Sequence, residues 1–266
     1  MNNRYKSVLS IAGSDSGGCA GIQADIKSIS ANGAFASTVI TATTAQNTQG
    51  VTDIHGIPPQ HIEKQLEAVL SDIEFGAVKI GMLHSVEVIE MVKNTLARYK
   101  VKNIILDPVM VATSGDALIS EEAIECLRSF LPSVYLITPN IPEAEILLGR
   151  SISFENVELS AKEISNKFDV SVLLKGGHLE FKEEMTDILF LKDEQRIVVI
   201  NNKAIDTKHT HGTGCSLSSA IATYVSLGCS LEESVVKGCT YLNQAIWDGK
   251  DKILGKGHGP INHFGL

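Results

Sequence analysis

A five-residue run, Asn103-Ile104-Ile105-Leu106-Asp107, is apolar in its middle and ends in a carboxylate. Continuous apolar runs of this length are typical of strands that are buried on both faces of a parallel sheet. Further runs of the same kind are Ser7 to Ala12, Ser37 to Ala42, Ala77 to Gly81, Val134 to Thr138 and Val170 to Lys175. Segments with helical periodicity separate these runs, so the pattern predicts an α/β fold with a mostly parallel sheet.

Three further segments add elements to this pattern. After Pro58-Pro59, apolar residues recur at helical spacing from Ile62 to Ile73, which predicts a helix. A capping box that starts at Ser230 predicts the first turn of another helix. Two runs, Thr186 to Leu191 and Arg196 to Asn201, flank a short polar turn and predict a β-hairpin.

The composition limits the class of protein. The 266 residues are 44% apolar and 20% charged, which is typical of a globular chain, and we expect a single domain over residues 1–266. A net charge of −8 offers no basic field for a phosphate backbone, so nucleic-acid binding is not expected. No run of about 18 apolar residues and no signal-peptide core occur, so we expect a cytoplasmic protein with no membrane span. The five cysteines include no Cys-x-x-Cys pair, which favours reduced thiols over disulfides or a zinc site.

The strongest candidate for chemistry is the stretch from Thr207 to Cys215, which leads directly into a predicted helix. Its turn, Gly212-Thr213-Gly214, would leave backbone N–H groups free at the positive end of the helix dipole, which suits a phosphate. The stretch contains no Walker loop. The alternative is a glycine-rich helix start that only turns the chain.

Cys215 follows that turn, and the helix dipole could lower the pKa of its thiol and allow it to accept a proton. The alternative is a small residue that serves only packing. A second glycine-rich segment, Ala12 to Gly21, leaves the first strand and would let a ligand approach the backbone closely. Asp25 lies just inside the following helix and either faces this cleft or is a solvated first-turn carboxylate.

Polar residues also end three later strands. Asp107 follows one strand, Asn140 and Glu143 follow the next, and Lys175 ends a third. The carboxyl ends of parallel strands share one edge of a sheet, where oxygen ligands could hold Mg²⁺ and nucleotide phosphates directly or through water. The alternatives are ordinary turn residues and an exposed lysine.

These segments and several others, taken in order, resemble the hydroxymethylpyrimidine/phosphomethylpyrimidine kinases of thiamin biosynthesis over nearly the whole chain. The motifs are Ala12-Gly13-Ser14-Asp15-Ser16-Gly17-Gly18, Gly21-Ile22-Gln23-Ala24-Asp25, Thr44-Ala45-Gln46-Asn47-Thr48, Lys79-Ile80-Gly81-Met82, Asp107-Pro108-Val109-Met110, Thr138-Pro139-Asn140, Lys175-Gly176-Gly177-His178, His211-Gly212-Thr213-Gly214-Cys215 and Gly257-His258-Gly259-Pro260. The resemblance implies a ribokinase-like three-layer α/β/α sandwich. It also implies phosphorylation, dependent on ATP and Mg²⁺, of a pyrimidine hydroxymethyl group and then of the monophosphate, by a homodimer.

The same resemblance implies roles for individual residues. Gln46 would read the pyrimidine ring, because an amide offers both a donor and an acceptor. Asp25 would face the amino substituent of the pyrimidine. The pocket would be lined by Gly13, Met82 and Val109.

The phosphate-transfer residues are implied in the same way. Gly212, Thr213 and Gly214 would form the anion hole. Cys215 would stand where sugar kinases of the superfamily place an aspartate base. The Mg²⁺ and phosphate cluster would comprise Asp107, Asn140 and Glu143, with Asp107 and Glu143 as metal ligands, and Lys175 would contact a phosphate.

Three other functions remain open at this point. A pyridoxal or pyridoxine kinase and a thiazole kinase share parts of the pattern, although Gln46 favours a pyrimidine. A non-catalytic pyrimidine-binding regulator would share the fold. The nearby histidines, which include His209, His211 and His258, lack metal-ligand spacing and are interpreted as non-metal residues.

Overall fold

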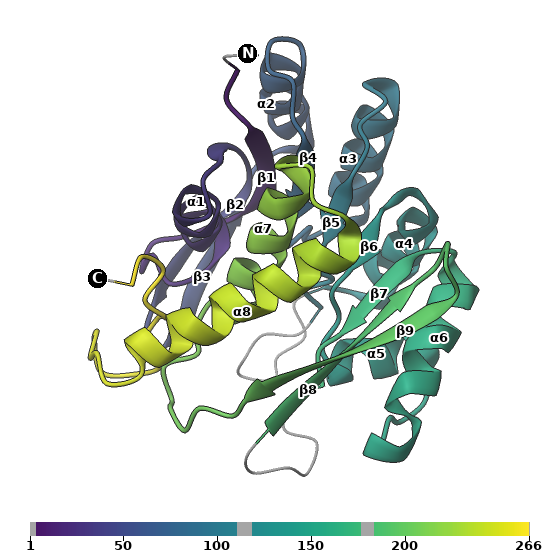
Figure 1. The fold of residues 1–266 in the computed structure, drawn as a ribbon. Helices are drawn as coiled ribbons and strands as arrows, with labels where there is room; N and C mark the ends of the chain where they lie inside the picture. The colour runs from purple at the N-terminus through teal and green to yellow at the C-terminus, as the bar shows by residue number, and fades with distance from the viewer. Residues whose placement is uncertain (1–3, 111–118, 177–183, 266) are drawn as a thin grey trace.

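The computed structural model describes residues 4–110, 119–176 and 184–265. Within these ranges the chain forms a nine-stranded sheet in the order β3-β2-β1-β4-β5-β6-β7-β8-β9 (Figure 1). The strands are β1 Ser7–Asp15, β2 Phe35–Asn47, β3 Gly50–Gly56, β4 Ala77–Ile80, β5 Ile104–Leu106, β6 Leu136–Ile137, β7 Ser171–Leu174, β8 Glu184–Leu191 and β9 Arg196–Lys203. All six predicted strands are present, and the prediction of a parallel arrangement among them is confirmed.

Antiparallel strands lie at both edges of this parallel centre. The predicted hairpin is β8 and β9, and β8 pairs with β7. At the other edge β3 pairs with β2, and the sequence pattern missed β3. Nearly every residue of β3 is exposed, so the strand shows none of the apolar alternation that a half-buried strand requires.

Helices cover both faces of the sheet, as the three-layer prediction requires (Figure 1). They are α1 Gly21–Ala31, α2 Pro59–Leu70, α3 Val86–Arg98, α4 Glu121–Phe130, α5 Ile141–Leu148, α6 Val157–Phe168, α7 Thr213–Ser226 and α8 Leu231–Gly249. One apolar core packs side chains of α2 to α6 against the sheet. A second core packs α1, α7 and α8 against the other face.

Local sequence sets the ends of these helices. The capping box predicted at Ser230 begins α8, and Pro58 and Pro59 stand at the start of α2. Helix α2 ends at Leu70, so the predicted span to Ile73 is too long. The N–H of Ile73 still donates to the Val69 carbonyl oxygen at 2.9 Å, which explains why the apolar periodicity continues beyond the helix.

None of the helices in the described ranges is long and apolar enough to cross a membrane. The parallel strands β1, β4, β5, β6 and β7 all point the same way, so their carboxyl ends meet along one edge of the sheet. Helix α7 begins from a turn that lies at this edge, beside Asp107 and Lys175. The fold therefore brings the predicted polar residues to one place.

Candidate functional site

Asp107 and Lys175 form an ion pair where β5 and β7 end. Lys175 Nζ lies 3.0 Å from Asp107 Oδ1, and the hydroxyl of Thr138, which follows β6, donates to the same oxygen at 3.0 Å. The side chains of Asp107 and Lys175 are 4% and 18% exposed. Burial disfavours the Lys175 ammonium, but the charges of Asp107 and Glu143 outweigh it and raise the pKa of Lys175. The alternative of an exposed strand-end lysine is therefore wrong.

Asn140 and Glu143 form the capping box of α5. The Asn140 side chain accepts from the Glu143 N–H at 2.9 Å, and Glu143 Oε2 accepts from the Asn140 N–H at 2.9 Å. Burial raises the pKa of Glu143 to about 7, although the nearby Lys175 ammonium opposes the shift. Burial disfavours the charged form of Glu143, and a cation bound nearby would favour it.

The turn predicted to bind an anion lies directly against the ion pair of Asp107 and Lys175. Gly212 precedes α7 with a φ of 84°, a left-handed conformation that favours glycine. A Cβ on Gly214 would lie 3.2 Å from Asp107 Oδ2 and 3.5 Å from Lys175 Nζ. The N–H groups of the first helical turn and the Lys175 ammonium therefore converge, which makes the site suitable for a phosphate.

Cys215 is the third residue of α7. Burial raises the pKa of its thiol to about 11; the Lys79 ammonium opposes the shift, whereas Asp25 and Asp107 add to it. The expectation that the helix dipole would lower this pKa is wrong. Desolvation disfavours the thiolate, and with a pKa of about 11 the thiol is protonated at neutral pH.

The second glycine-rich segment is organised by Asp15, a residue to which sequence reasoning gave no role. Its carboxylate accepts from the N–H groups of Gly17, Cys19 and Ala20 at 2.7, 2.9 and 2.8 Å. A Cβ on Gly212 would lie 1.9 Å from the Cys19 carbonyl oxygen, so the two glycine-rich segments touch. The sequence signal for this role was an aspartate before Ser-Gly-Gly, a typical start for an Asx turn.

Asp25 is fully buried, which rules out the solvated alternative. Its two carboxylate oxygens lie 2.8 and 2.9 Å from Lys79 Nζ. The carboxylate also accepts from the hydroxyls of Ser10 at 2.5 Å and Ser219 at 2.8 Å. Sequence reasoning gave Lys79 no role, because a lysine inside an apolar strand shows nothing of its partner.

Of the residues assigned to line the pyrimidine pocket, Gly13 and Gln46 lie on β1 and β2, and Met82 and Val109 follow β4 and β5. A Cβ on Gly13 would lie 3.0 Å from Met82 Cε, so these two residues adjoin. The side chain of Gln46 is half-buried near the end of β2, and its amide contacts Thr44 and His211. Val109 is also half-buried and follows Asp107. Gly177 and His178 of the predicted Lys-Gly-Gly-His motif lie outside the described residues.

The chain is similar to several known proteins. Residues 15–262 match the family described as phosphomethylpyrimidine kinase. The hydroxymethylpyrimidine/phosphomethylpyrimidine kinase of Rhizobium meliloti is 44% identical over 259 residues, which cover 96% of this chain and 96% of that protein. A thiamine biosynthesis bifunctional protein of Geobacter sulfurreducens is 47% identical over 97% of this chain, which spans about half, 52%, of that protein. The structure of a Bacillus subtilis pyridoxal kinase in complex with ADP has a TM-score of 0.89 at 30% identity and covers 98% of both chains.

Proposed function

The chain belongs to the phosphomethylpyrimidine kinase family and has its ribokinase-like fold, and from this we propose how its site phosphorylates a pyrimidine. The γ-phosphoryl group of ATP passes to the hydroxymethyl group of 4-amino-5-hydroxymethyl-2-methylpyrimidine, and a second ATP converts the monophosphate to the diphosphate. One observation carries the proposal: Gly214 adjoins both the ammonium of Lys175 and the carboxylate of Asp107.

The transfer breaks the bond between the γ-phosphorus and the oxygen that it shares with the β-phosphate, and forms a bond to the hydroxymethyl oxygen. Most of the catalysis is positioning and charge neutralisation, because the transition state of phosphoryl transfer is loose. Lys175 and the N–H groups of the Gly212-Thr213-Gly214 turn would neutralise the transferred group. Since little deprotonation is needed early, the protonated thiol of Cys215 is suited to position the hydroxyl group. A role as base requires that ligand binding first produce the thiolate.

The donor set of the site fits Mg²⁺. Kinase sites usually hold this ion with one or two carboxylates, waters and the substrate phosphates. Asp107 and Glu143 would supply the carboxylates, and Glu143, whose Oε2 already accepts from Asn140, would act through water. When bound, the ion would neutralise charge on the phosphate oxygens. Asn140 would keep the Glu143 carboxylate in place.

Gln46 would distinguish the pyrimidine from other acceptors. An aminopyrimidine presents a ring nitrogen that accepts and an amino group that donates, and a glutamine amide complements both. Gly13, Met82 and Val109 would form apolar walls around the ring. Asp25 was assigned to the amino substituent, but its carboxylate already accepts from Lys79, Ser10 and Ser219, so any contact with substrate would add to these bonds.

A second candidate function is phosphorylation of pyridoxal. The likeness to a pyridoxal kinase over 98% of the chain favours it. Both substrates carry a hydroxymethyl group on a nitrogen heteroaromatic ring, so the phosphate side of the site serves either. A thiazole kinase and a non-catalytic regulator remain as further alternatives.

An assay of ADP release separates these functions. The protein is supplied with Mg²⁺ and ATP and with hydroxymethylpyrimidine, its monophosphate, pyridoxal or hydroxyethylthiazole. We expect turnover of both pyrimidine species at the highest kcat/KM. A preference for pyridoxal would reassign Gln46 but retain the phosphate site, and absence of turnover in a sample that still binds pyrimidine would favour the regulator.

The sequence predicts a cytoplasmic protein with a single domain over residues 1–266, and the resemblance implies a homodimer; we include these features in the proposal. Light scattering coupled to gel filtration measures the mass. A mass twice that of the 28.6 kDa chain is expected.

A further inference from the structure

His211 contacts Gln46 from the other side of the site. Gln46 Nε2 lies 3.0 Å from His211 Nε2. At the opposite end of the amide, the Thr44 hydroxyl lies 3.0 Å from Gln46 Oε1. Burial lowers the pKa of His211; the charge of Asp15 opposes this shift and His258 adds to it. A neutral imidazole with its proton on Nδ1 accepts through Nε2, so the amide nitrogen donates to it.

With the His211 proton on Nδ1, this contact sets the orientation of the Gln46 amide. The oxygen and nitrogen ends of a glutamine side chain have nearly the same shape, and only their partners decide which end points where. With Nε2 against His211 and Oε1 against Thr44, the amide keeps one N–H and one lone pair for a ligand. With the His211 proton on Nδ1, a flipped amide would place the oxygen lone pairs of Gln46 against the lone pair of His211 Nε2, which is repulsive; with the proton on Nε2, the ring would instead donate to that oxygen.

The C-terminal segment from 255 to 260 holds His211 in place. The His211 N–H donates to the Gly259 carbonyl oxygen at 3.1 Å, and His211 pairs with Pro260. The N–H of Gly259 donates to His209 Nδ1 at 3.1 Å, and a Cβ on Gly259 would lie only 2.6 Å from the same atom. Glycine is therefore required where this segment passes His209.

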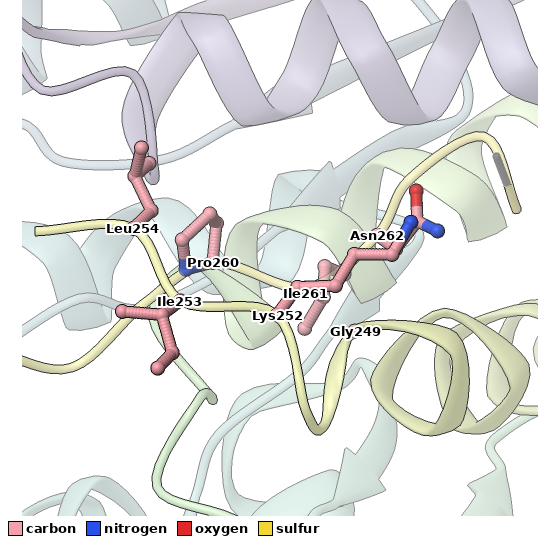
Figure 2. Close-up of a pocket in the computed structure, with 7 residues that line it drawn as sticks. All are labelled: Gly249, Lys252, Ile253, Leu254, Pro260, Ile261 and Asn262. Carbon is pink, nitrogen blue, oxygen red and sulfur yellow. The ribbon is translucent and has the colours of Figure 1, made fainter.

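The same segment also reaches the turn that follows Gln46. The His258 N–H donates to the Thr48 carbonyl oxygen at 2.9 Å, and a Cβ on Gly257 would lie 1.9 Å from that oxygen. A cavity of about 140 Å³ adjoins Pro260, the last residue of this segment (Figure 2). Its lining residues are Gly249, Lys252, Ile253, Leu254, Pro260, Ile261 and Asn262. The C-terminal segment thus links the Gln46 turn to the turn before α7.

We propose that His211 is a positioning residue for substrate specificity, which fixes the amide of Gln46 so that its free N–H and lone pair match an aminopyrimidine edge. This role rests on the proposed function, in which Gln46 reads the pyrimidine. Pyridoxal presents a phenolic oxygen and a methyl group instead of the amino-substituted ring edge. Its phosphorylation therefore depends less on which way the amide points.

Three variants test the role of His211. His211→Phe keeps the ring shape and removes the acceptor, and His211→Gln replaces the imidazole with an amide oxygen that can accept. His258→Phe is the matched control, because the His258 ring is exposed and contacts the Lys208 carbonyl oxygen rather than Gln46. The measurements are kcat/KM for hydroxymethylpyrimidine and for pyridoxal, KM for ATP, and the Kd of hydroxymethylpyrimidine by calorimetry.

We expect His211→Phe to lower kcat/KM for the pyrimidine relative to pyridoxal by about tenfold, the effect of one lost hydrogen bond. His211→Gln should restore part of the ratio of kcat/KM for the pyrimidine to kcat/KM for pyridoxal, and His258→Phe should leave this ratio unchanged. KM for ATP should not move in any variant. An equal loss with both substrates would show a merely structural role, and an unchanged ratio would show no role; either outcome overturns the inference.

If the proposed function is wrong, the result differs from the outcomes that overturn the role of His211. In that case the wild-type protein itself would not phosphorylate hydroxymethylpyrimidine. Calorimetry then still tests His211, because a weaker Kd for the pyrimidine in His211→Phe but not in His258→Phe supports the inference. Equal Kd values, or no binding by the wild-type protein, overturn it.

Discussion

At the scale of single residues, burial and the helix N-terminus act in opposite directions on the pKa of the Cys215 thiol. The residue stands in the first turn of α7, where the dipole favours a thiolate. Its surroundings instead raise the pKa of the thiol to about 11, chiefly through burial. The thiol is therefore protonated in the ligand-free protein at neutral pH, and its function depends on what the bound substrates change.

Replacing this thiol tests its part in the transfer. We expect Cys215→Ala to lower kcat by about 100-fold, at the lower end of what a positioned proton-transfer group contributes. KM for the pyrimidine should stay nearly the same, because the ring is read elsewhere. Steady-state kinetics of Cys229→Ala, which changes a partly exposed cysteine beyond the C-terminal end of α7, provide the comparison. An unchanged kcat in Cys215→Ala would refute both the positioning role and the base role.

At the scale of elements, the turn before α7 depends on two glycine-rich segments that fit together. Gly212 has a left-handed conformation, and the Cys19 carbonyl oxygen occupies the space where its Cβ would be. Asp15 holds the Cys19 segment through three backbone N–H groups. The shape of the turn that we propose to bind an anion is thus set by a loop from the other end of the chain.

A methyl group at Gly212 should disrupt this fit. We expect Gly212→Ala to destabilise the fold by about 2 kcal/mol or more, because strain from a positive φ adds to the clash. ATP binding should weaken at the same time. The control is Gly228→Ala, where φ is 93° but no atom lies within 4 Å of the new Cβ.

The control isolates the clash from the backbone strain. Urea unfolding should show a smaller loss for Gly228→Ala, of about 1 kcal/mol, and calorimetry should show unchanged ATP binding. Equal losses of unfolding free energy in Gly212→Ala and Gly228→Ala would mean that the clash with the Cys19 carbonyl oxygen contributes nothing to the destabilisation.

At the scale of the whole molecule, the buried pair of Lys79 and Asp25 joins four elements. Lys79 lies on β4 and Asp25 on α1, while the serines that donate to Asp25 lie on β1 and α7. Both charged side chains are 0% exposed. Helix α7, which follows the turn that we propose to bind an anion, is therefore fixed to the sheet through this buried ion pair.

Removing one partner should leave the other charge buried and alone. We expect Lys79→Met to destabilise the protein by about 3–5 kcal/mol, as is usual for a broken buried pair. Lys79→Met combined with Asp25→Leu should recover part of this loss. Arg98→Ala, which breaks a surface pair with Glu67, should change stability by less than about 1 kcal/mol. A small loss in urea unfolding of Lys79→Met would contradict the assignment of a charged pair.

His263, near the C-terminus, makes the free energy of unfolding depend on pH. His263 is buried, and its Nε2 lies 3.0 Å from the hydroxyl of Ser216 on α7. Burial lowers the pKa of His263 to about 4. Because the unfolded chain binds this proton below its ordinary pKa and the folded chain does not, the stability contributed by neutral His263 is present above that value. It is lost as the pH falls toward about 4.

We expect this residue alone to reduce the free energy of unfolding by about 2 kcal/mol between pH 7 and pH 5. His263→Gln should flatten the dependence by that amount. His61→Gln, at an exposed position on α2, should keep the wild-type dependence of the free energy of unfolding on pH. Urea unfolding at each pH measures this dependence. Identical slopes in all three proteins would refute the role of His263.

Much of the fold was predictable from the sequence because its signals are local. The run Asn103 to Asp107 reads as a buried strand from its own residues, and so do the other parallel strands. Once the strands are parallel, geometry requires that Asp107, Asn140 and Lys175 share an edge, and the structure places them there. Strand β3 was missed because its residues are exposed and carry no periodic signal.

The sequence by itself determined the parallel centre of the sheet, the alternation of its strands with helices, and the edge at which the strand-end residues gather, because periodicity and chain direction act over a few residues. Only the tertiary structure decided that Asp25 is held by Lys79 and by Ser219, which lies 194 residues away. It alone decided that Gln46 faces His211, and that the Cys215 thiol is protonated. Burial and the charges of distant residues set these properties, and neither quantity is carried by any single stretch of sequence.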